Sequence, residues 1–226
     1  MKARYVTNTY QITDKYTNIL LNAKDAKVKI EPSNDNSTTL VVVEKKRNPY
    51  TFFIRDNTLT IQLTKRKWYH FLKIGIDHSE IKLTVPQSML EEIQVTSNVG
   101  AVDICSITCN GAMSIKTNTG RVNVENAVCK NFHSKGNSGV VSLNNLAAKE
   151  NISIKRNTGK IELNDCTAPD IFVKTNTGKV SGKLPSNVAI TARANTGKID
   201  VPKVPIGAAV GGRCEIKTNT GSIQFE

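Results

Sequence analysis

The chain has 226 residues and a formal charge of +12, because 31 Lys and Arg outnumber 19 Asp and Glu. Aromatic residues make up only 5% of it, which argues against a large globular core filled by rings. Thr, Asn, Val, Ile, Lys and Gly are prominent instead, a composition typical of strands and tight turns. The positive charge predicts an anionic partner or surface, although solubility alone accounts for it equally well.

Five cysteines argue against a disulfide framework, because their number is odd and all lie beyond residue 100. They fit reduced thiols in a reducing compartment. Cys105 and Cys109 have a spacing seen in metal sites, but no second Cys or His pair completes one, so neither a metal nor another cofactor is predicted. The start of the chain lacks the apolar core of a signal peptide, and no segment is long enough to span a bilayer. The default expectation is a cytoplasmic protein.

Short strand-like segments separated by Asn, Asp and Pro occupy the first part of the chain, namely residues 26–32, 38–46, 51–56, 58–65 and 80–86. A stack of coils needs its first coil covered, because an open end exposes unpaired strand edges and apolar interior. We therefore predict that residues 1–92 form a β-rich cap and that residues 93–226 form a repeat array, in one continuous folded unit.

One segment of this cap has an unusual composition. Residues 65–73 place four cations around Trp68, Tyr69, His70 and Phe71. If exposed, the cluster could contact a membrane interface, a sugar or a nucleic-acid base. If folded into a hairpin connection, it would bury its rings beneath cationic stems. Trp68 is therefore a candidate ligand-binding residue.

Seven repeats of about twenty residues follow, each centred on an Asn-X-Gly sequence. The glycines are Gly100, Gly120, Gly139, Gly159, Gly178, Gly197 and Gly221. The asparagine two residues earlier is Asn98, Asn118, Asn137, Asn157, Asn176, Asn195 and Asn219. Apolar residues recur seven residues before and two residues after each glycine. Each repeat is thus predicted to be two short strands around a structural bend.

Two all-β folds accommodate such a repeat. In a β-solenoid, each repeat forms one coil and equivalent positions stack about 4.8 Å apart. In an array of stacked β-hairpins, Asn-X-Gly is the loop between two antiparallel strands. The solenoid explains why like residues recur at each position, and stacked asparagines can hydrogen-bond from coil to coil. The hairpin alternative is supported by two pairs of opposite charges, Lys155 with Glu162 and Arg193 with Asp200, whose members could face each other across a turn.

The repeats also resemble a known family. The runs 116–124, 155–163 and 174–182 (KTNTGRVNV, KRNTGKIEL and KTNTGKVSG) are similar to a bacterial β-strand-repeat family of unknown function labelled "putative adhesin". Members open with a β-rich segment that closes with Val-Pro, and residues 81–89 resemble that junction. The resemblance covers nearly the whole chain. It implies a β-helix-like fold and association with the bacterial cell envelope, and it brings no catalytic residues with it.

Cations recur at two positions of the repeat, one on each side of the bend. Four residues before the glycine stand Lys116, Lys135, Lys155, Lys174, Arg193 and Lys217, and one residue after it stand Arg121, Lys160, Lys179 and Lys198. In a stack of coils these would form two basic columns, the longer extending over about 24 Å. Positive charges at this short separation repel each other unless an acidic ligand neutralises them. We predict an anion-binding surface here, against the alternative that the cations only keep strands soluble.

An enzyme is the least favoured class. Glycoside chemistry needs two carboxylates, and Glu162 and Asp200 occupy one column about 9.6 Å apart if the coils stack in sequence order. No aromatic platform, nucleophile arrangement or phosphate loop accompanies them, so we do not expect an enzyme, although a polysaccharide-active one is the first alternative.

The predicted function is therefore a non-catalytic binding or scaffold module. Its expected partners are an anionic glycan, a wall polymer or lipid headgroups, whereas nucleic acid is not expected because no nucleic-acid motif is present. A second alternative is a self-associating structural module. Its contact would be the C-terminal coil, because residues 222–226 form a strand that runs to the last residue. That end is either bare or sealed by the insertion at 198–212, and the sequence does not decide between the two.

Overall fold

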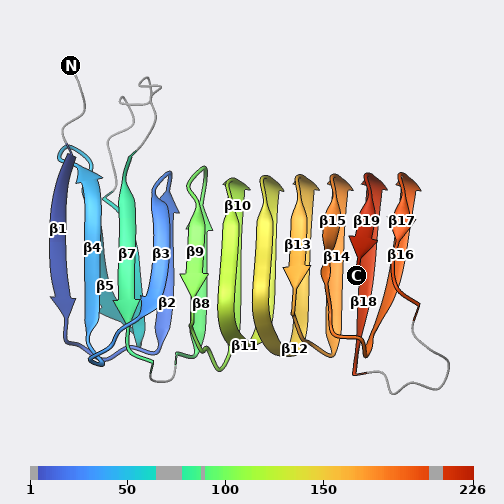
Figure 1. Ribbon diagram of the computed structural model, residues 1–226. Coiled ribbons are helices and arrows are strands. Elements are labelled where there is room, and N and C mark those ends of the chain that lie inside the picture. Colours follow the sequence, from blue (N-terminus) through green and yellow to red (C-terminus); the bar gives the residue numbers. More distant parts are fainter. Residues whose placement is uncertain (1–4, 65–77, 88–89, 204–210) are drawn as a thin grey trace.

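The computed structural model describes residues 5–64, 78–87, 90–203 and 211–226. Together these residues form 19 strands (Figure 1). No helix in this part of the chain is long and apolar enough to span a bilayer. The strands are β1 (Tyr5–Ile12), β2 (Asn18–Lys24), β3 (Lys27–Pro32), β4 (Thr38–Lys45), β5 (Tyr50–Arg55), β6 (Thr58–Leu63), β7 (Glu80–Val85), β8 (Glu92–Ser97), β9 (Val102–Cys105), β10 (Ala112–Thr119), β11 (Val122–Ser138), β12 (Val141–Thr158), β13 (Ile161–Asn164), β14 (Asp170–Thr177), β15 (Val180–Lys183), β16 (Val188–Thr196), β17 (Ile199–Asp200), β18 (Gly212–Thr220) and β19 (Ile223–Phe225).

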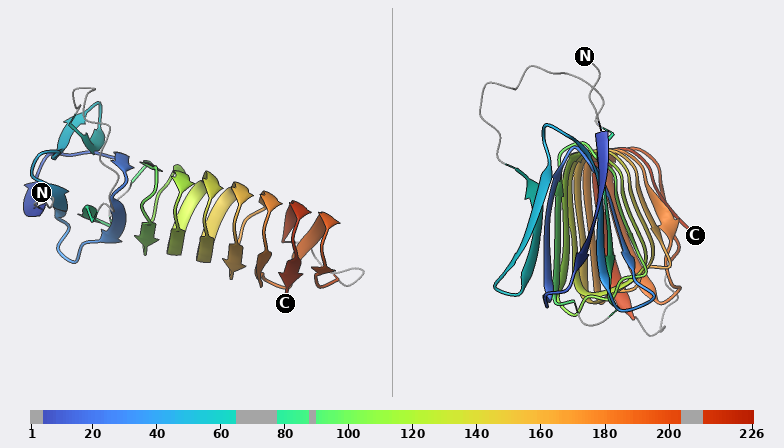
Figure 2. Two further views of the ribbon diagram at one scale, coloured as in Figure 1. Left: turned by 90° about the horizontal axis from the view of Figure 1, so that it is seen from above. Right: turned by 90° about the vertical axis from the view of Figure 1, so that its left-hand side faces the viewer.

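Equivalent positions of neighbouring repeats pair in parallel. Lys116 in β10 is aligned with Lys135 in β11, and Val122 in β11 is aligned with Val141 in β12. The two strands that flank one bend pair with their counterparts in adjacent coils instead of with each other. The result is a rod of stacked coils (Figure 2). The prediction of an all-β, solenoid-like chain is therefore confirmed, and the alternative of stacked hairpins is wrong.

Each complete coil has three sides. We call the strand before the bend the first side, the strand after it the second side, and the short segment that leads to the next coil the third side. Left-handed residues form the corner between the second and third sides, at Ser106, Asn126, Asn145 and Asp165. Along the strands of each coil, successive side chains point alternately to the interior and to solvent, as the two-residue period of a strand requires.

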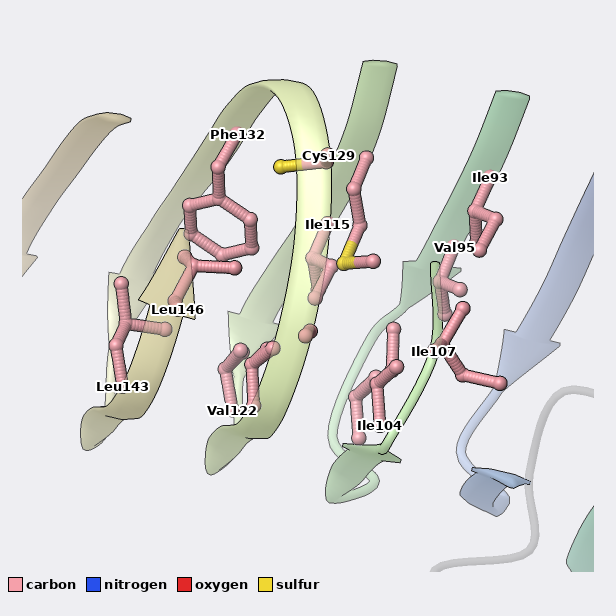
Figure 3. Packing of buried hydrophobic residues seen from close by; sticks show 14 of the residues in the cluster. Ile93, Val95, Ile104, Ile107, Ile115, Val122, Cys129, Phe132, Leu143 and Leu146 are labelled. Atoms are coloured by element: carbon pink, nitrogen blue, oxygen red, sulfur yellow. The ribbon is translucent and has the colours of Figure 1, made fainter. Parts of the chain in front are cut away.

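The interior of the rod is a continuous apolar core. Figure 3 shows side chains of successive coils, among them Ile93, Ile115 and Phe132, packed against one another inside the rod. The apolar positions seven before and two after each glycine supply much of this core, and most of them are fully buried. Burial of these columns against each other stabilises the stack through the hydrophobic effect.

The bend glycines are required by how closely the coils approach. Gly159 has φ +141°, and a Cβ atom built on it would lie 1.9 Å from the carbonyl oxygen of Gly139. The Gly159 amide donates to the Thr177 carbonyl of the next coil at 2.9 Å. Any side chain would break this contact, because only glycine adopts this backbone region without strain.

Several bend asparagines also connect adjacent coils. Asn118 donates to the side-chain oxygen of Asn98 at 3.2 Å, and Asn157 donates to that of Asn137 at 3.1 Å. Asn98 donates in turn to Asp25, in the bend between β2 and β3. The amide columns therefore contribute to the stack as well as to the bends.

The coils at the C-terminal end do not stack in sequence order. The coil of β18 and β19 lies between that of β14 and β15 and that of β16 and β17, as the red ribbon between orange ones shows in Figure 1. The C-terminal coil, which the alternative of a self-associating module used as its contact, is therefore paired on both faces. The outermost coil is that of β16 and β17, where Ile199 is 41% exposed.

The N-terminal end has a similar exchange. The coil of β2 and β3 lies between that of β6 and β7 and that of β8 and β9, all in parallel pairing. Strands β1, β4 and β5 add antiparallel pairs beyond them. Parallel stacking thus extends into residues before 92, and the division at that residue stays a prediction.

The glycine column gives a first prediction. Replacing Gly159 with Ala should destabilise the protein by at least about 2 kcal/mol, because it combines backbone strain with a clash against Gly139. Replacing the exposed neighbour Thr158 with Ala should cost less than about 0.5 kcal/mol. Urea unfolding measures both, and equal stability of the two variants would contradict the stacking contact.

The buried thiols give a second prediction. Burial raises the pKa of Cys129 from 9.0 to about 12 and that of Cys214 to about 12. Above pH 9 the unfolded chain releases thiol protons that the folded chain retains, so stability should fall as pH rises from 8 to 10. The Cys129→Ala variant should lose about 1 kcal/mol less over this interval. Urea unfolding at both pH values tests this, and equal losses in the variant and the parent protein would refute it.

Candidate functional site

Six cations stand in register on the outer surface of the first side. We call them the lysine column, which in spatial order consists of Lys116, Lys135, Lys155, Lys174, Lys217 and Arg193. Each lies on a strand directly beside the next, so neighbouring positions are about 4.8 Å apart. The exchange of the last two coils places Lys217 before Arg193 but leaves the column unbroken.

Few acidic groups neutralise this column. Among the described residues, only Lys217 of the six forms an ion pair, with Glu215 at 2.6 Å. This contact lowers the pKa of Glu215, chiefly through the hydrogen bond from Lys217. The ammonium groups of Lys155 and Lys217 each lie 5.7 Å from the centre of the Phe172 ring, which attracts them. The column therefore keeps most of its positive charge.

A buried arginine adds to the charge behind this surface. Arg156 follows Lys155 in the chain, but its side chain enters the rod and is only 4% exposed. Its Nη2 atom donates to Ser134 Oγ at 3.0 Å, and its guanidinium occupies the space beside Gly136 that a side chain would fill. Burial lowers the pKa of Arg156 from 12.5 to about 10, so the group stays charged at neutral pH.

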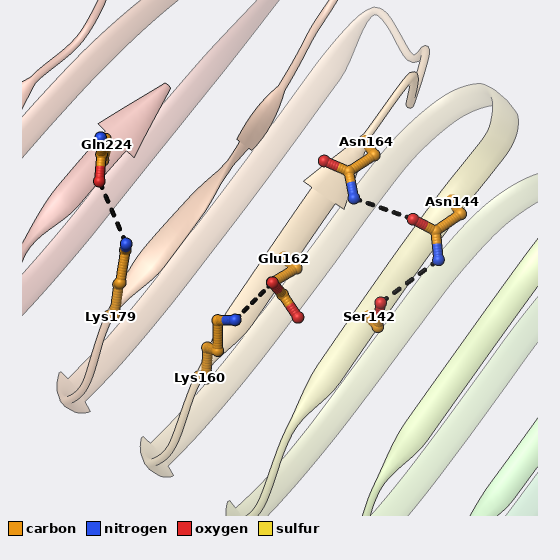
Figure 4. A network of polar contacts seen from close by, with 7 residues as sticks. All are labelled: Ser142, Asn144, Lys160, Glu162, Asn164, Lys179 and Gln224. Atoms are coloured by element: carbon orange, nitrogen blue, oxygen red, sulfur yellow. Dashed lines mark hydrogen bonds and ion pairs between the residues drawn. The ribbon is translucent and has the colours of Figure 1, made fainter. Parts of the chain in front are cut away.

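The predicted cations of the second side are a weaker candidate. Lys160 pairs with Glu162 at 2.5 Å, and Lys179 donates to Gln224 at 3.1 Å (Figure 4). Lys198 pairs with Asp200 at 3.4 Å. Val140 separates Arg121 from Lys160 in this column, and the exchanged coil places Ser222 between Lys179 and Lys198. These cations are interrupted and partly neutralised.

The lysine column continues into a groove at its N-terminal end. In register with Lys116 stand Thr96, then Asn22, then Gln62, so uncharged polar groups replace the cations there. The groove has a volume of about 830 Å³. Its lining includes five carboxamides and three ammonium groups, from Asn22, Gln62, Asn98, Asn118, Asn137, Lys24, Lys116 and Lys135. Thr117 also lines the groove, but its Oγ1 atom is fully buried, and it has no hydrogen-bond partner in the described part of the chain.

The carboxylate pair considered for catalysis is too far apart. Glu162 aligns with Ser181, Ser181 with Gln224, and Gln224 with Asp200, so three strand spacings separate the pair instead of two. That distance is about 14 Å, beyond the carboxylate separations of glycoside hydrolases. The hypothesis that this pair cleaves glycans is therefore wrong.

Trp68 and the rest of segment 65–73 fall outside the described residues. Within the described ranges, no group of three or more His, Cys, Asp or Glu side chains could hold a metal ion. The groove itself was not predicted, because Asn22 and Gln62 belong to segments without the repeat. Only the parallel pairing of β6, β2 and β8 brings them beside the lysine column.

The model of the family described as Toastrack DUF4097 matches residues 16–226. The chain belongs to this family. The resemblance noted from the repeats is thereby confirmed. No curated protein matches the sequence.

Solved structures share the fold of this Toastrack chain. A "putative adhesin" from Bacteroides fragilis NCTC 9343 is 18% identical with a TM-score of 0.57, over 99% of this chain and 97% of that one. A "putative cell adhesion protein" from Clostridium sporogenes ATCC 15579 is 12% identical with a TM-score of 0.50, over 98% of this chain and 99% of that one. At such identities the likeness concerns the fold alone.

Proposed function

We propose that this chain is a non-catalytic binding module that holds an anionic polymer along the lysine column. The observation that carries the proposal is the register of six cations, only one of which has an ion pair among the described residues. Such a column repels itself, and a polymer with regularly spaced negative charges removes that repulsion at every coil.

Rigidity supports the same function. The lysines stand on strands whose backbones are paired on both sides, so their spacing is fixed before any ligand arrives. A preformed surface loses less entropy on binding than a flexible basic tail does. The cations also provide long-range attraction, which increases the rate of encounter with a negatively charged partner.

The cell envelope is the proposed location. The fold is shared with proteins described as a "putative adhesin" and a "putative cell adhesion protein". Anionic wall polymers and acidic glycans are abundant on bacterial surfaces and present the extended negative charge that the lysine column fits. An enzyme is not proposed, because the structure separates the candidate carboxylates.

Charge removal tests the column. A triple variant with Lys155, Lys174 and Arg193 replaced by Gln should bind polygalacturonate at least about tenfold more weakly, because three cation contacts are lost. The slope of log affinity against log salt should become shallower by about 2. Isothermal titration calorimetry at several salt concentrations measures both.

A charge-matched variant is the control. Replacing Lys149, Lys183 and Lys203 with Gln removes the same charge from exposed positions outside the column. This control should retain at least half of the parent protein's affinity. If both triple variants lose the same affinity, net charge accounts for binding and the lysine column is not the site.

A further inference from the structure

The groove at the end of the lysine column contains polar groups that the protein leaves without partners. Among the described residues, the side chains of Asn22 and Gln62 make no hydrogen bond, although both are half-buried. Both carboxamides are accessible to solvent, so a ligand in the groove can hydrogen-bond to them in exchange for water.

The chemistry of these groups favours hydroxyls over bare anions. A carboxamide both donates and accepts hydrogen bonds, and so does a hydroxyl. Phosphate and carboxylate oxygens only accept, so they would leave the amide oxygens of Asn22 and Gln62 unsatisfied. Sugars carry hydroxyls that do both. The groove is therefore suited to a saccharide, while the lysines beyond it are suited to negative charge.

The spacing of the charges further restricts the class of ligand that fits. The column offers one cation per about 4.8 Å, the distance between paired strands. Duplex DNA carries one charge per about 1.7 Å, which is more charge than one column can neutralise. A polysaccharide with one carboxylate on each sugar carries its charges about one sugar length apart, which is close to the strand spacing.

We propose that the groove and the lysine column together bind an acidic polysaccharide with one carboxylate per sugar. One end of the bound segment lies in the groove, where Asn22 and Gln62 contact its hydroxyls. Its carboxylates follow Lys116, Lys135 and Lys155 along the first side. This inference rests on the proposed function and adds to it the chemical class of the polymer and the position of its end.

Two short ligands, one with hydroxyl groups and one without, distinguish recognition of hydroxyls from attraction between charges. A variant with Asn22 and Gln62 both replaced by Leu keeps every lysine and the approximate size of both side chains. It should bind trigalacturonate about tenfold more weakly, because two or more hydrogen bonds are lost. It should bind tripolyphosphate, which lacks hydroxyls, as the parent protein does. The matched control is Gln94→Leu, on β8 but outside the groove, which should change neither affinity.

Calorimetry with both probes decides the outcome, and urea unfolding confirms that each variant is folded. Unchanged trigalacturonate binding in the groove variant would overturn the inference, and so would an equal loss for both probes. The triple column variant with long polygalacturonate keeps the two proposals apart. If that variant binds normally, the proposed function fails. If it binds weakly while the groove variant is unaffected, only the saccharide inference fails.

Discussion

In-register parallel pairing between coils is the constraint on which the rest of this structure depends. Because the strands of the repeats pair with equivalent strands of neighbouring coils, equivalent repeat positions lie about 4.8 Å apart. Aliphatic positions then build a core, glycines permit close backbone approach, and asparagines hydrogen-bond along the rod. The same rule brings lysines together on the first side, where stacking is unfavourable. The charge of the column is thus not favoured by the stacking itself, which is why the column stands out as a surface for another molecule.

The period of the sequence was enough to predict most of the architecture. Seven glycines in phase implied the parallel register, the buried aliphatic columns and the alignment of Lys116 with its counterparts. The order of the terminal coils could not be predicted in this way, because equivalent repeats offer nearly equivalent pairing surfaces. Nothing in the local sequence of β18 distinguishes a place beside β14 from a place beyond β16. The distance between Glu162 and Asp200 was wrong for this reason.

Individual side chains were predicted less well than columns. Arg156 belongs to a position that faces the interior, and Gly136 in the neighbouring coil leaves the space that its guanidinium fills. This fit between Arg156 and Gly136 depends on which coils are neighbours, so it could not be predicted from the local sequence. The groove is similar, since Asn22 and Gln62 are about forty residues apart in sequence. The cations of the second side showed the converse error, because acidic residues two positions further along the strand neutralise Lys160 and Lys198.

The exchanged coil near the C-terminus has a mechanical consequence. A solenoid stacked in sequence order peels apart from its end under tension, one coil interface at a time. Here the coil of β18 and β19 is paired on both faces, with β14 on one side and β16 on the other. A force that pulls on this coil must rupture both interfaces at once. Pulling on it therefore meets more resistance than pulling on a coil that is paired on one face.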